Sequence, residues 1–353
     1  MLVSIQFWLF CVLWAVIVHN LSAYIPYLIV RVALVLLCPL YFKPYFYKQV
    51  PSDKRCDGRT VCVIGASTGI GRALARLLTD RGATVVRAAR SIDMLETQQK
   101  EDGGSGLSLH VDLADLGSIR RFAAQLKAQV PRLDCLVLNA AYHGAQRTTK
   151  DGFEYTLGVN HLGHMYLVHE LLDVLIRNGP SQIVVVASDL HRMCPKVRFN
   201  DLMYQAPGSY TLMGFTAYNH SKLCNVLFAG ELASRLRGTG VTVSAAHPGT
   251  PVQSELVRSN AFFGHWLIHN YILPLVYFLW CRRAADGAQT LLHCVVDRQA
   301  QTQTGLYYEN LRSVSPSAAA VDQRAANEMW TKSCDLLKID ADWGTSTRKT
   351  ACG

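Results

Sequence analysis

Short apolar runs recur along most of the chain, and segments with helical spacing separate them. After the first such run, apolar side chains at Ile70, Leu74, Leu77 and Leu78 recur at intervals of three and four residues, a pattern typical of one helix face. The runs predicted as strands are Thr60 to Ile64, Thr84 to Ala88, Leu107 to Val111, Cys135 to Leu138, Ile183 to Ala187, Val241 to Ala245 and Leu306 to Tyr308. This alternation predicts an α/β fold with a doubly wound parallel sheet, whose ligand binds at the carboxyl ends of the strands.

The amino-terminal segment has a different pattern. Residues Leu2 to Val18 carry no charge, and after His19-Asn20 the run Leu21 to Phe42 carries only Arg31. Apolar stretches of this length predict a membrane anchor over residues 1–48, either as one tilted span or as a hairpin at the polar break. A buried pair of globular helices is the alternative. We therefore expect an anchor at 1–48, a folded domain at 55–340 and a polar tail at 341–353.

The charges around the apolar segment predict its orientation. Lys43, Lys48, Lys54 and Arg55 follow it, whereas no basic residue precedes it. The positive-inside rule then places the folded domain in the cytosol. The eleven cysteines are scattered without a Cys-x-x-Cys pair, which indicates reduced thiols rather than disulfides or a zinc site.

A glycine-rich turn, Gly65-Ala66-Ser67-Thr68-Gly69-Ile70-Gly71, lies between the first predicted strand and the first predicted helix. Glycines let a backbone approach a pyrophosphate closely, and the following helix start offers free N–H groups and a positive dipole end. The spacing is Gly-x-x-x-Gly-x-Gly rather than Gly-x-Gly-x-x-Gly, so the usual dinucleotide fingerprint does not apply as written. A tight structural turn remains the alternative.

A tyrosine and a lysine four residues apart, Tyr218 and Lys222, provide candidate proton chemistry downstream of a serine, Ser188. Residues at i and i+4 share a helix face, so the ammonium can lie near the phenol and favour its ionised form. That would make the phenol a usable proton shuttle. The spacing alone arises often by chance, and its weight comes from the motifs around it.

The series of motifs resembles the short-chain dehydrogenase/reductase family, and within it the membrane-anchored branch of retinol and polyprenol dehydrogenases. The resemblance covers about residues 58–340. Besides the glycine turn and Tyr218 to Lys222, it rests on Asp112-Leu113-Ala114-Asp115, Leu138-Asn139-Ala140-Ala141, Val159-Asn160-His161-Leu162-Gly163-His164, Ala187-Ser188 and His247-Pro248-Gly249. Two departures are Ala141, where the family usually has glycine, and Ala187, where it usually has a first serine.

The resemblance implies roles for individual residues. Tyr218 would be the general acid/base, Lys222 would bind the nicotinamide ribose, Ser188 would bind the substrate carbonyl, and Asn160 would support a water relay. The same resemblance implies a nicotinamide cofactor. The expected cofactor contacts are Gly65, Ser67, Thr68, Gly69, Ile70, Gly71, Arg90, Asp112, Leu113, Asn139, Ala140, Ala141, Tyr218, Lys222, Pro248, Gly249 and Thr250.

The end of the second predicted strand indicates which cofactor is preferred. Ala89 stands where NAD-preferring relatives carry an aspartate, and Arg90 follows it. An acid near this position binds the ribose 2′-hydroxyl of NAD, whereas an arginine accommodates the 2′-phosphate of NADP. The sequence therefore predicts NADP(H), with a solvent-facing arginine as the alternative.

A second apolar block, Ala261 to Cys281, contains seven aromatic residues. In enzymes that resemble this chain, the substrate lid lies at this place, and an aromatic lid would suit a lipid and contact a bilayer surface. A second membrane span and a contact within a homo-oligomer are the alternatives. We expect an NADP(H)-dependent oxidoreductase of the endoplasmic reticulum or lipid-droplet membrane that acts on a retinoid, polyprenoid, sterol or fatty aldehyde. A catalytically weak NADP-binding interaction protein is the rival.

Two other features do not change this expectation. His161, His164 and His169 have metal-like spacing, but the first two belong to the motif around Asn160, so no metal site is predicted. The formal net charge of +9 is dispersed without basic-aromatic runs. An anionic membrane surface and a phosphorylated cofactor explain it more simply than nucleic acid does.

Overall fold

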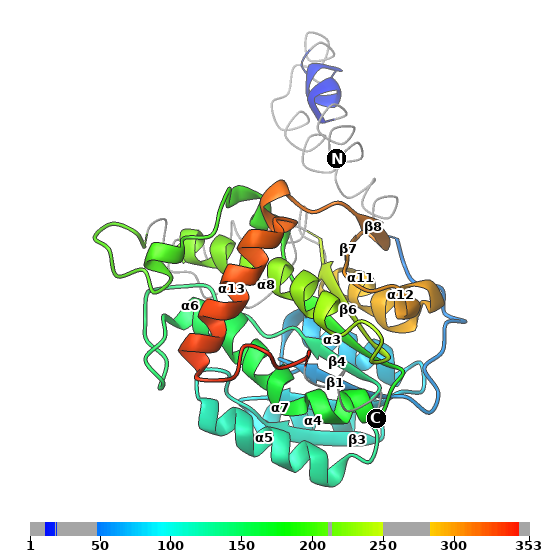
Figure 1. Cartoon of the computed structure of the whole chain (residues 1–353). Helices are drawn as coiled ribbons and strands as arrows, with labels where there is room; N and C mark the ends of the chain where they lie inside the picture. Colours follow the sequence, from blue (N-terminus) through cyan, green and yellow to red (C-terminus); the bar gives the residue numbers. More distant parts are fainter. Residues whose placement is uncertain (1–10, 18, 20–47, 211–213, 250–282, 346–353) are drawn as a thin grey trace. The chain divides into compact units, whose positions relative to one another are not determined.

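One eight-stranded sheet organises the folded part of the chain (Figure 1). The computed structural model describes residues 11–17, 19, 48–210, 214–249 and 283–345. The strand order is β3-β2-β1-β4-β5-β6-β7-β8, with β1 to β7 parallel and β8 antiparallel to β7. The strands are β1 Thr60–Ile64, β2 Thr84–Ala89, β3 Gly106–His110, β4 Cys135–Leu138, β5 Ser181–Val186, β6 Val241–His247, β7 Leu306–Glu309 and β8 Arg312–Val314.

Helices cover both faces of the sheet. On one face pack α5 Leu116–Gln129, α7 Gly163–Arg177, α8 Phe215–Arg235 and α13 Gln323–Leu337, and on the other α3 Gly69–Thr79, α4 Ile92–Asp102 and α11 Ala284–Val296. The shorter elements are α6 Tyr155–Leu157, the π-helical turn η1 Gly158–Leu162, α12 Arg298–Thr302 and the 3₁₀ turns η2 Asp189–Met193, η3 Phe199–Asp201 and η7 Ala318–Ala320.

Side-chain alternation along the strands builds the two layers. In β1, Cys62 and Ile64 pack with α5, α7 and α8, whereas Val61 and Val63 pack with α3 and α11. Successive residues of a strand point to opposite faces, and all four of these side chains are fully buried. A strand buried on both faces is mostly apolar. All seven predicted strands are present, and their ends differ from the predictions by at most two residues.

The sequence did not predict β8. Its three residues include two exposed polar side chains, Arg312 and Ser313, so it lacks the apolar pattern of a buried strand. The two-residue turn Asn310-Leu311 connects it to β7, and both turn residues have positive φ angles, 50° and 61°, as a tight hairpin requires. The doubly wound sheet is thus confirmed, with an added antiparallel edge.

The predicted amino-terminal anchor lies mostly outside the described residues. In the part of the chain that the structure describes, no helix is both long enough and apolar enough to cross a bilayer. The aromatic block 261–281 also lies outside that part. The chain divides into two compact units, and the larger one, Gln49–Phe263 with Arg282–Gly353, contains the sheet.

Packing of the larger unit extends beyond the expected limits of 55 and 340. Val50 is buried, and its N–H donates to the side chain of Gln289 over 2.8 Å. At the other end, the Trp343 ring stacks on Trp330 at 4.5 Å and is 6% exposed. Trp343 therefore holds the start of the predicted tail against α13.

Candidate active site

The glycine turn forms a cradle whose shape depends on missing side chains. Gly65 follows β1 with φ +82°, and an added Cβ there would lie 2.7 Å from the Cα of Ala140. At Gly71 an added Cβ would lie 2.1 Å from the Gly65 carbonyl oxygen. Contacts below 3.0 Å force the backbone to shift, so neither position accepts a side chain without rearrangement. The glycines thus bring β1, the start of α3 and the loop after β4 close together.

The start of α3 offers free backbone donors to an anion. Thr68 is the N-cap residue, its side chain makes no capping hydrogen bond, and the first turn carries no acidic residue. The first N–H groups of a helix have no partner within the helix and lie at its positive dipole end. This arrangement fits the pyrophosphate of a dinucleotide.

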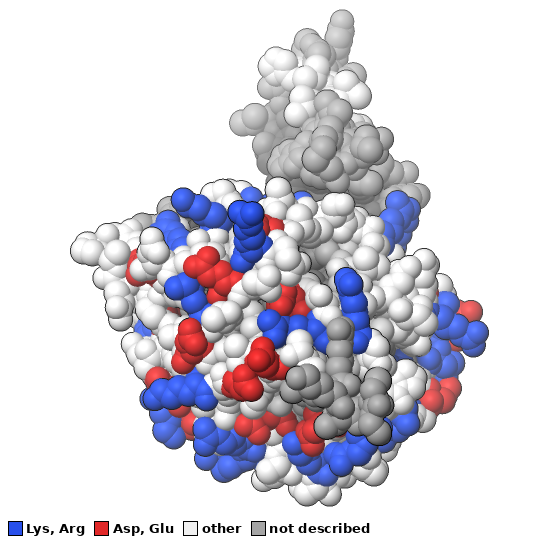
Figure 2. Space-filling view, in the orientation of Figure 1, with Lys and Arg blue, Asp and Glu red and all other residues white. Residues whose placement is uncertain are grey.

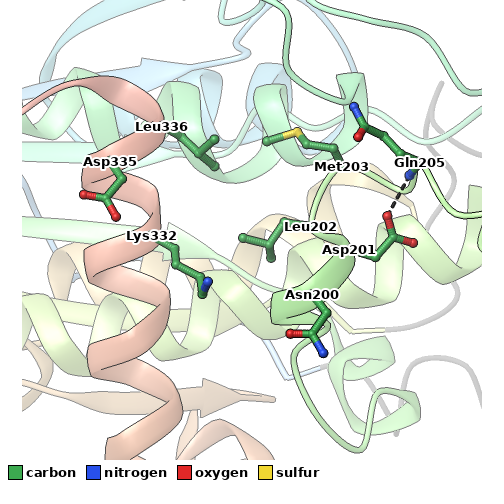
Figure 3. Close-up of a pocket in the computed structure, with 8 residues that line it drawn as sticks. All are labelled: Asn200, Asp201, Leu202, Met203, Gln205, Lys332, Asp335 and Leu336. Atoms are coloured by element: carbon green, nitrogen blue, oxygen red, sulfur yellow. Dashed lines mark hydrogen bonds between the residues drawn. The ribbon is translucent and has the colours of Figure 1, made fainter.

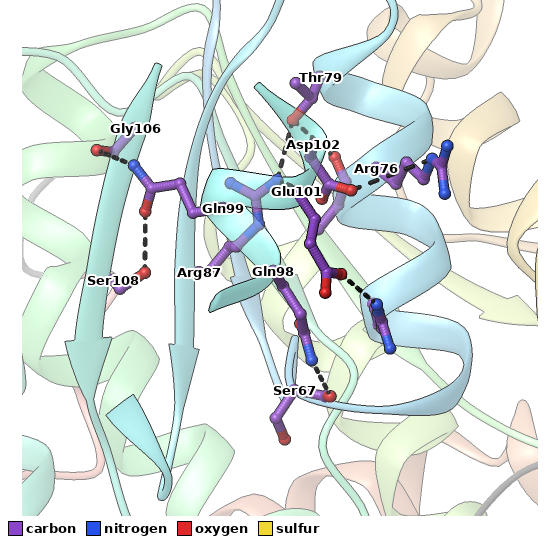
Figure 4. A network of polar contacts seen from close by, with 12 residues as sticks. Ser67, Arg76, Thr79, Arg87, Gln98, Gln99, Glu101, Asp102, Gly106 and Ser108 are labelled. Carbon is purple, nitrogen blue, oxygen red and sulfur yellow. Dashed lines mark hydrogen bonds and ion pairs between the residues drawn. The ribbon is translucent and has the colours of Figure 1, made fainter. Parts of the chain in front are cut away.

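Polar side chains on neighbouring elements hold the cradle in place. The Asn139 side-chain amide donates to the Gly65 carbonyl over 3.1 Å and to the Ile64 carbonyl over 3.3 Å. From α4, the Gln98 amide donates to the Ser67 carbonyl over 2.6 Å (Figure 4). Asn139 was predicted to contact the cofactor, and in the structure it supports the turn. Gln98 was not predicted, because nothing in a sequence shows that α4 folds back onto the turn.

A buried ion pair fixes α4 relative to β2. Arg87 is fully buried in β2, and its guanidinium donates to Asp102 over 2.8 Å and to the Thr79 hydroxyl over 3.1 Å (Figure 4). Arg90 lies three residues further along, just past the strand end, and is exposed. In contrast to Arg87, it makes no hydrogen bond or ion pair with any residue that the structure describes. It is therefore available to an external anion.

Other predicted cofactor residues lie beyond the ends of β3 and β6. Asp112 follows β3, and one of its carboxylate oxygens accepts from the Ala114 N–H over 3.0 Å. Leu113 is buried beside Gly163, at the start of α7. Pro248 is buried after β6, and Gly249 follows it with φ +87°. Thr250 lies outside the described residues.

Ser188, Tyr218 and Lys222 converge beyond the end of β5. Ser188 lies two residues after β5 and is the N-cap of η2, whereas Tyr218 and Lys222 lie one turn apart on α8. The Ser188 hydroxyl lies close enough to the Tyr218 phenol to lower its pKa. All three residues are at most 7% exposed. The structure thus brings together the three residues predicted to carry the proton chemistry.

Burial dominates the protonation of this group. It raises the pKa of Tyr218 to about 12, and the nearby Ser188 hydroxyl opposes the rise. It also lowers the pKa of Lys222 to about 7. The Lys222 ammonium donates to the Val186 carbonyl over 2.9 Å and lies 5.5 Å from the centre of the Tyr218 ring. In this arrangement the Lys222 ammonium is therefore bonded to the last residue of β5.

Asn160 lies in the π-helical turn η1 and is fully buried. Its side-chain oxygen accepts from the Tyr142 N–H over 2.6 Å, and its amide donates to the Tyr142 carbonyl and the Ser221 hydroxyl, both over 2.9 Å. A π-helical turn inside a helix is frequent at functional sites. Here it places Asn160 between α8 and the loop after β4, which contains Ala140 and Ala141.

His143 and Phe215 are neighbours of the site that sequence reasoning did not identify. The His143 ring centre lies 5.0 Å from that of Tyr218 and 4.4 Å from that of Phe215. His143 is 5% exposed, and burial lowers its pKa. His143 lies two residues after Ala141, the last residue of the motif Leu138-Asn139-Ala140-Ala141. This closeness in the sequence was the only signal that could have identified it.

The histidines with metal-like spacing have separate partners. His161 shares a hydrogen bond of 2.9 Å with Ser333, His164 bonds to the Asn160 carbonyl over 3.1 Å, and His169 packs on Trp343. Within the described residues no cluster of histidine, cysteine or acidic side chains could hold a metal ion.

The visible surface carries no single charged patch. Figure 2 shows Lys and Arg interspersed with Asp and Glu over the visible face of the molecule. A surface pocket of about 310 Å³ lies between η3 and α13, and Leu202, Met203 and Lys332 are among its lining residues (Figure 3). None of the predicted site residues lines it.

Comparisons with known proteins agree with this geometry. A model of the short chain dehydrogenase family matches residues 59–198. Mouse retinol dehydrogenase 11 is 37% identical over 298 residues, which are 83% of this chain and 90% of the relative. Human retinol dehydrogenase 12 is 40% identical over 294 residues, covering 82% and 89%. Bovine dehydrogenase/reductase SDR family member 13 is 40% identical over 290 residues, covering 80% and 74%.

Solved structures show the same fold. A protein of uncharacterised function from Mycobacterium paratuberculosis superposes with a TM-score of 0.66 at 29% identity, over 83% of this chain and 99% of that one. The 3-ketoacyl-(acyl-carrier-protein) reductase from Brucella melitensis, complexed with NADH, superposes with a TM-score of 0.54 at 20% identity, over 71% and 96%.

The fold and the similarity to short-chain dehydrogenases define an α/β oxidoreductase that acts on alcohols or carbonyls. The chain belongs to the short-chain dehydrogenase/reductase family, and it is similar to members named retinol dehydrogenases.

Proposed function

We propose that the protein is a membrane-anchored, NADP(H)-dependent dehydrogenase/reductase that converts a lipophilic alcohol and its carbonyl into each other. The observation that carries the proposal is the buried contact of Ser188 with Tyr218, one helical turn from Lys222 and on the same edge of the sheet as the glycine cradle. Proton chemistry and a dinucleotide site meet at this edge, as an alcohol-to-carbonyl reaction needs.

The cofactor supplies hydride transfer at C4 of its nicotinamide. Gly65, Gly71 and the free donors at the start of α3 would hold the pyrophosphate, with Asn139 and Gln98 fixing the turn. Arg90, exposed and without a described partner, would hold the 2′-phosphate of NADP. Lys222 would leave the Val186 carbonyl to bind the ribose hydroxyls.

In the reducing direction, the Ser188 and Tyr218 hydroxyls both donate to the substrate carbonyl oxygen. Tyr218 then gives up its proton to that oxygen, and in oxidation its phenolate takes the proton back. Because the Tyr218 phenol has a pKa of about 12, it gives up its proton readily only when its phenolate is stabilised. Lys222 provides that stabilisation once its ammonium leaves the β5 carbonyl and approaches the phenolate.

The proposed substrates are lipophilic: a retinoid, polyprenoid, sterol or fatty aldehyde. The relatives named retinol dehydrogenases support this class. Two exposed apolar side chains near the site also support it, namely Phe215, which packs on His143, and Met193, at the end of the serine turn η2. Apolar side chains at the entrance favour apolar ligands because their contact with water is replaced on binding.

The membrane placement rests on the sequence. We propose that residues 1–48 anchor the chain in the endoplasmic reticulum, or in the lipid-droplet surface, with the folded domain in the cytosol. Deletion of residues 1–48 should release the domain from microsomes. Protease added to sealed microsomes should digest the domain of the full chain. Protection of that domain would contradict the orientation, and membrane retention of the deleted chain that resists high salt would contradict the anchor.

The rival function is a catalytically weak NADP-binding interaction protein. A chain selected only for binding need not keep proton-transfer groups, yet Asn160, Ser188, Tyr218 and Lys222 are all present, and Ser188 lies close enough to Tyr218 to lower its pKa. This arrangement favours turnover.

The decisive experiment uses the detergent-solubilised full chain with NADPH or NADH and a panel of carbonyls: retinaldehyde, decanal, a polyprenal and a 3-ketosteroid. Loss of cofactor absorbance and identification of the alcohol product measure turnover. We expect reduction of at least one panel member with NADPH preferred. Cofactor binding without turnover of any member would favour the rival function.

A further inference from the structure

A buried histidine is hydrogen-bonded to the backbone of the serine turn η2. His191 lies in η2 and is fully buried. Its Nδ1 lies 2.7 Å from the Ser188 carbonyl oxygen, and its Nε2 lies 3.1 Å from the backbone nitrogen of Ser317. A backbone N–H can only donate, so Nε2 accepts and the ring proton is on Nδ1, which donates to Ser188. Burial lowers the pKa of His191, which agrees with this neutral tautomer.

The contact links two segments that are far apart in the sequence. Ser317 lies between β8 and η7, 126 residues after His191. The neighbouring Arg192 donates to the Ser315 carbonyl over 3.0 Å. The Tyr307 ring packs edge-on against His191, with centroids 5.2 Å apart. The hairpin of β7 and β8 therefore supports the serine turn through the imidazole.

We propose that His191 is a positioning residue that fixes the Ser188 backbone so that the serine hydroxyl stays directed at Tyr218 and the substrate oxygen. The proposal rests on the proposed function of Ser188. The Ser188 hydroxyl also accepts from the Leu190 N–H over 3.3 Å, so a rotation of the Ser188 peptide would move the hydroxyl. A displacement of about 1 Å in an active site can cost about 10²-fold in rate.

Two substitutions separate the two hydrogen bonds. Asparagine places its amide nitrogen where Nδ1 lies and keeps the donor to Ser188, whereas glutamine places its amide oxygen where Nε2 lies and keeps the acceptor for Ser317. With NADPH and the fastest panel aldehyde, retinaldehyde being tried first, His191→Asn should retain most of kcat. His191→Gln should lower kcat by about 10- to 100-fold, the scale of a misplaced catalytic group. The KM for NADPH should stay unchanged in both.

A matched control lies on the opposite face of the same strand. His293 packs edge-on against Tyr308, with centroids 5.7 Å apart, as His191 packs against Tyr307. It is on α11 and contacts none of the proposed catalytic residues. His293→Gln should therefore change Tm without changing kcat.

Ser188→Ala is measured first and separates the two proposals. If it retains the full rate, the proposed role of Ser188 fails. If Ser188→Ala loses activity while His191→Gln keeps it, only the role of His191 fails. Equal losses in His191→Asn and His191→Gln, or failure of both to fold, would assign the histidine to folding alone and overturn the inference.

Discussion

The cofactor cradle and the serine turn lie on the same edge of the sheet, but they are built in opposite ways. The cradle depends on side chains that are absent: at Gly65 and Gly71 a single added carbon would collide with the backbone. The serine turn depends on buried polar side chains that are present, because Ser188, His191 and Tyr218 each need a partner. Shape fixes the first region, and hydrogen bonds fix the second.

Under the proposed function, this difference separates cofactor binding from catalysis. A change in the cradle should remove the space for the cofactor, whereas a change in the serine turn should leave the cofactor bound and alter proton transfer. The cradle and the serine turn should also respond differently to pH. Buried histidines lie in and around η1, η2 and α8 of the catalytic region: His161, His164, His191 and His220. The cradle is fixed instead by backbone contacts and the side-chain amides of Asn139 and Gln98.

The largest effect is expected at Gly71. Gly71→Ala places a Cβ 2.1 Å from the Gly65 carbonyl oxygen and 2.4 Å from the Asn139 amide nitrogen. One of these atoms is backbone and cannot move alone, so the cradle must open. NADPH binding, measured by fluorescence titration, should become too weak to detect.

Gly230→Ala is the control, since Gly230 is also helical but an added Cβ there meets nothing within 4 Å. It should bind NADPH normally and gain about 0.5–1 kcal/mol of stability from helix propensity. Normal binding by the Gly71 variant would show that the cradle is not the cofactor site.

The next effect is expected at the phenol. Tyr218→Phe removes the proposed proton donor and should lower kcat by about 10²- to 10⁴-fold, the usual value of positioned acid/base catalysis. Its affinity for NADPH should hardly change. Tyr308→Phe is a matched control, because Tyr308 is also buried and its hydroxyl has no hydrogen-bond partner in the described part of the chain. A Tyr218 variant that turns over at the rate of the Tyr308 variant would contradict the proposed mechanism.

A smaller effect is expected at the cofactor 2′-position. The double change Ala89→Asp with Arg90→Ser should reverse the preference from NADPH to NADH, because the new carboxylate repels the 2′-phosphate and accepts from a free hydroxyl. Hydrogen bonds to charged groups contribute about 1.5–3 kcal/mol, which corresponds to roughly 10- to 150-fold in affinity. The ratio of kcat/KM for the two cofactors measures the change. An unmoved ratio would remove Arg90 from the cofactor site.

Much of this architecture was visible in the sequence. The central parallel strands could be predicted because burial on both faces favours a continuous apolar run, as in Cys135–Leu138. β8 could not, because an exposed edge strand such as Arg312–Val314 needs no such run. The positions of Ser188 and Tyr218 followed from the motif series, and the structure brings them together.

The contacts that support the site could not be predicted in the same way. His191 bonds to Ser317 and Gln98 bonds to Ser67, and each pair forms only when distant elements pack. The position of the Lys222 ammonium was also not predictable, since helical spacing places it near Tyr218 but does not show that the Val186 carbonyl competes for it. Spacing predicts which residues share a face, whereas packing decides which partner each one takes.

The smallest predicted effect uses the pH response of the catalytic region. His220, on α8, accepts from the Arg198 N–H over 3.0 Å, and burial lowers its pKa to about 4, with Arg198 adding to the fall and Asp201 opposing it. Because the unfolded histidine binds its proton more tightly, with a pKa near 6.5, this stability is present at neutral pH and is lost as the pH falls from about 6.5 towards 4. At pH 5 the loss of folding free energy relative to pH 7 is about 2 kcal/mol.

His220→Gln keeps an acceptor for the Arg198 N–H but does not titrate. Urea unfolding at pH 7 and pH 5 should therefore show a smaller acid loss in the variant than in the unmodified chain. Equal losses in the two proteins would mean that His220 is not kept neutral by burial.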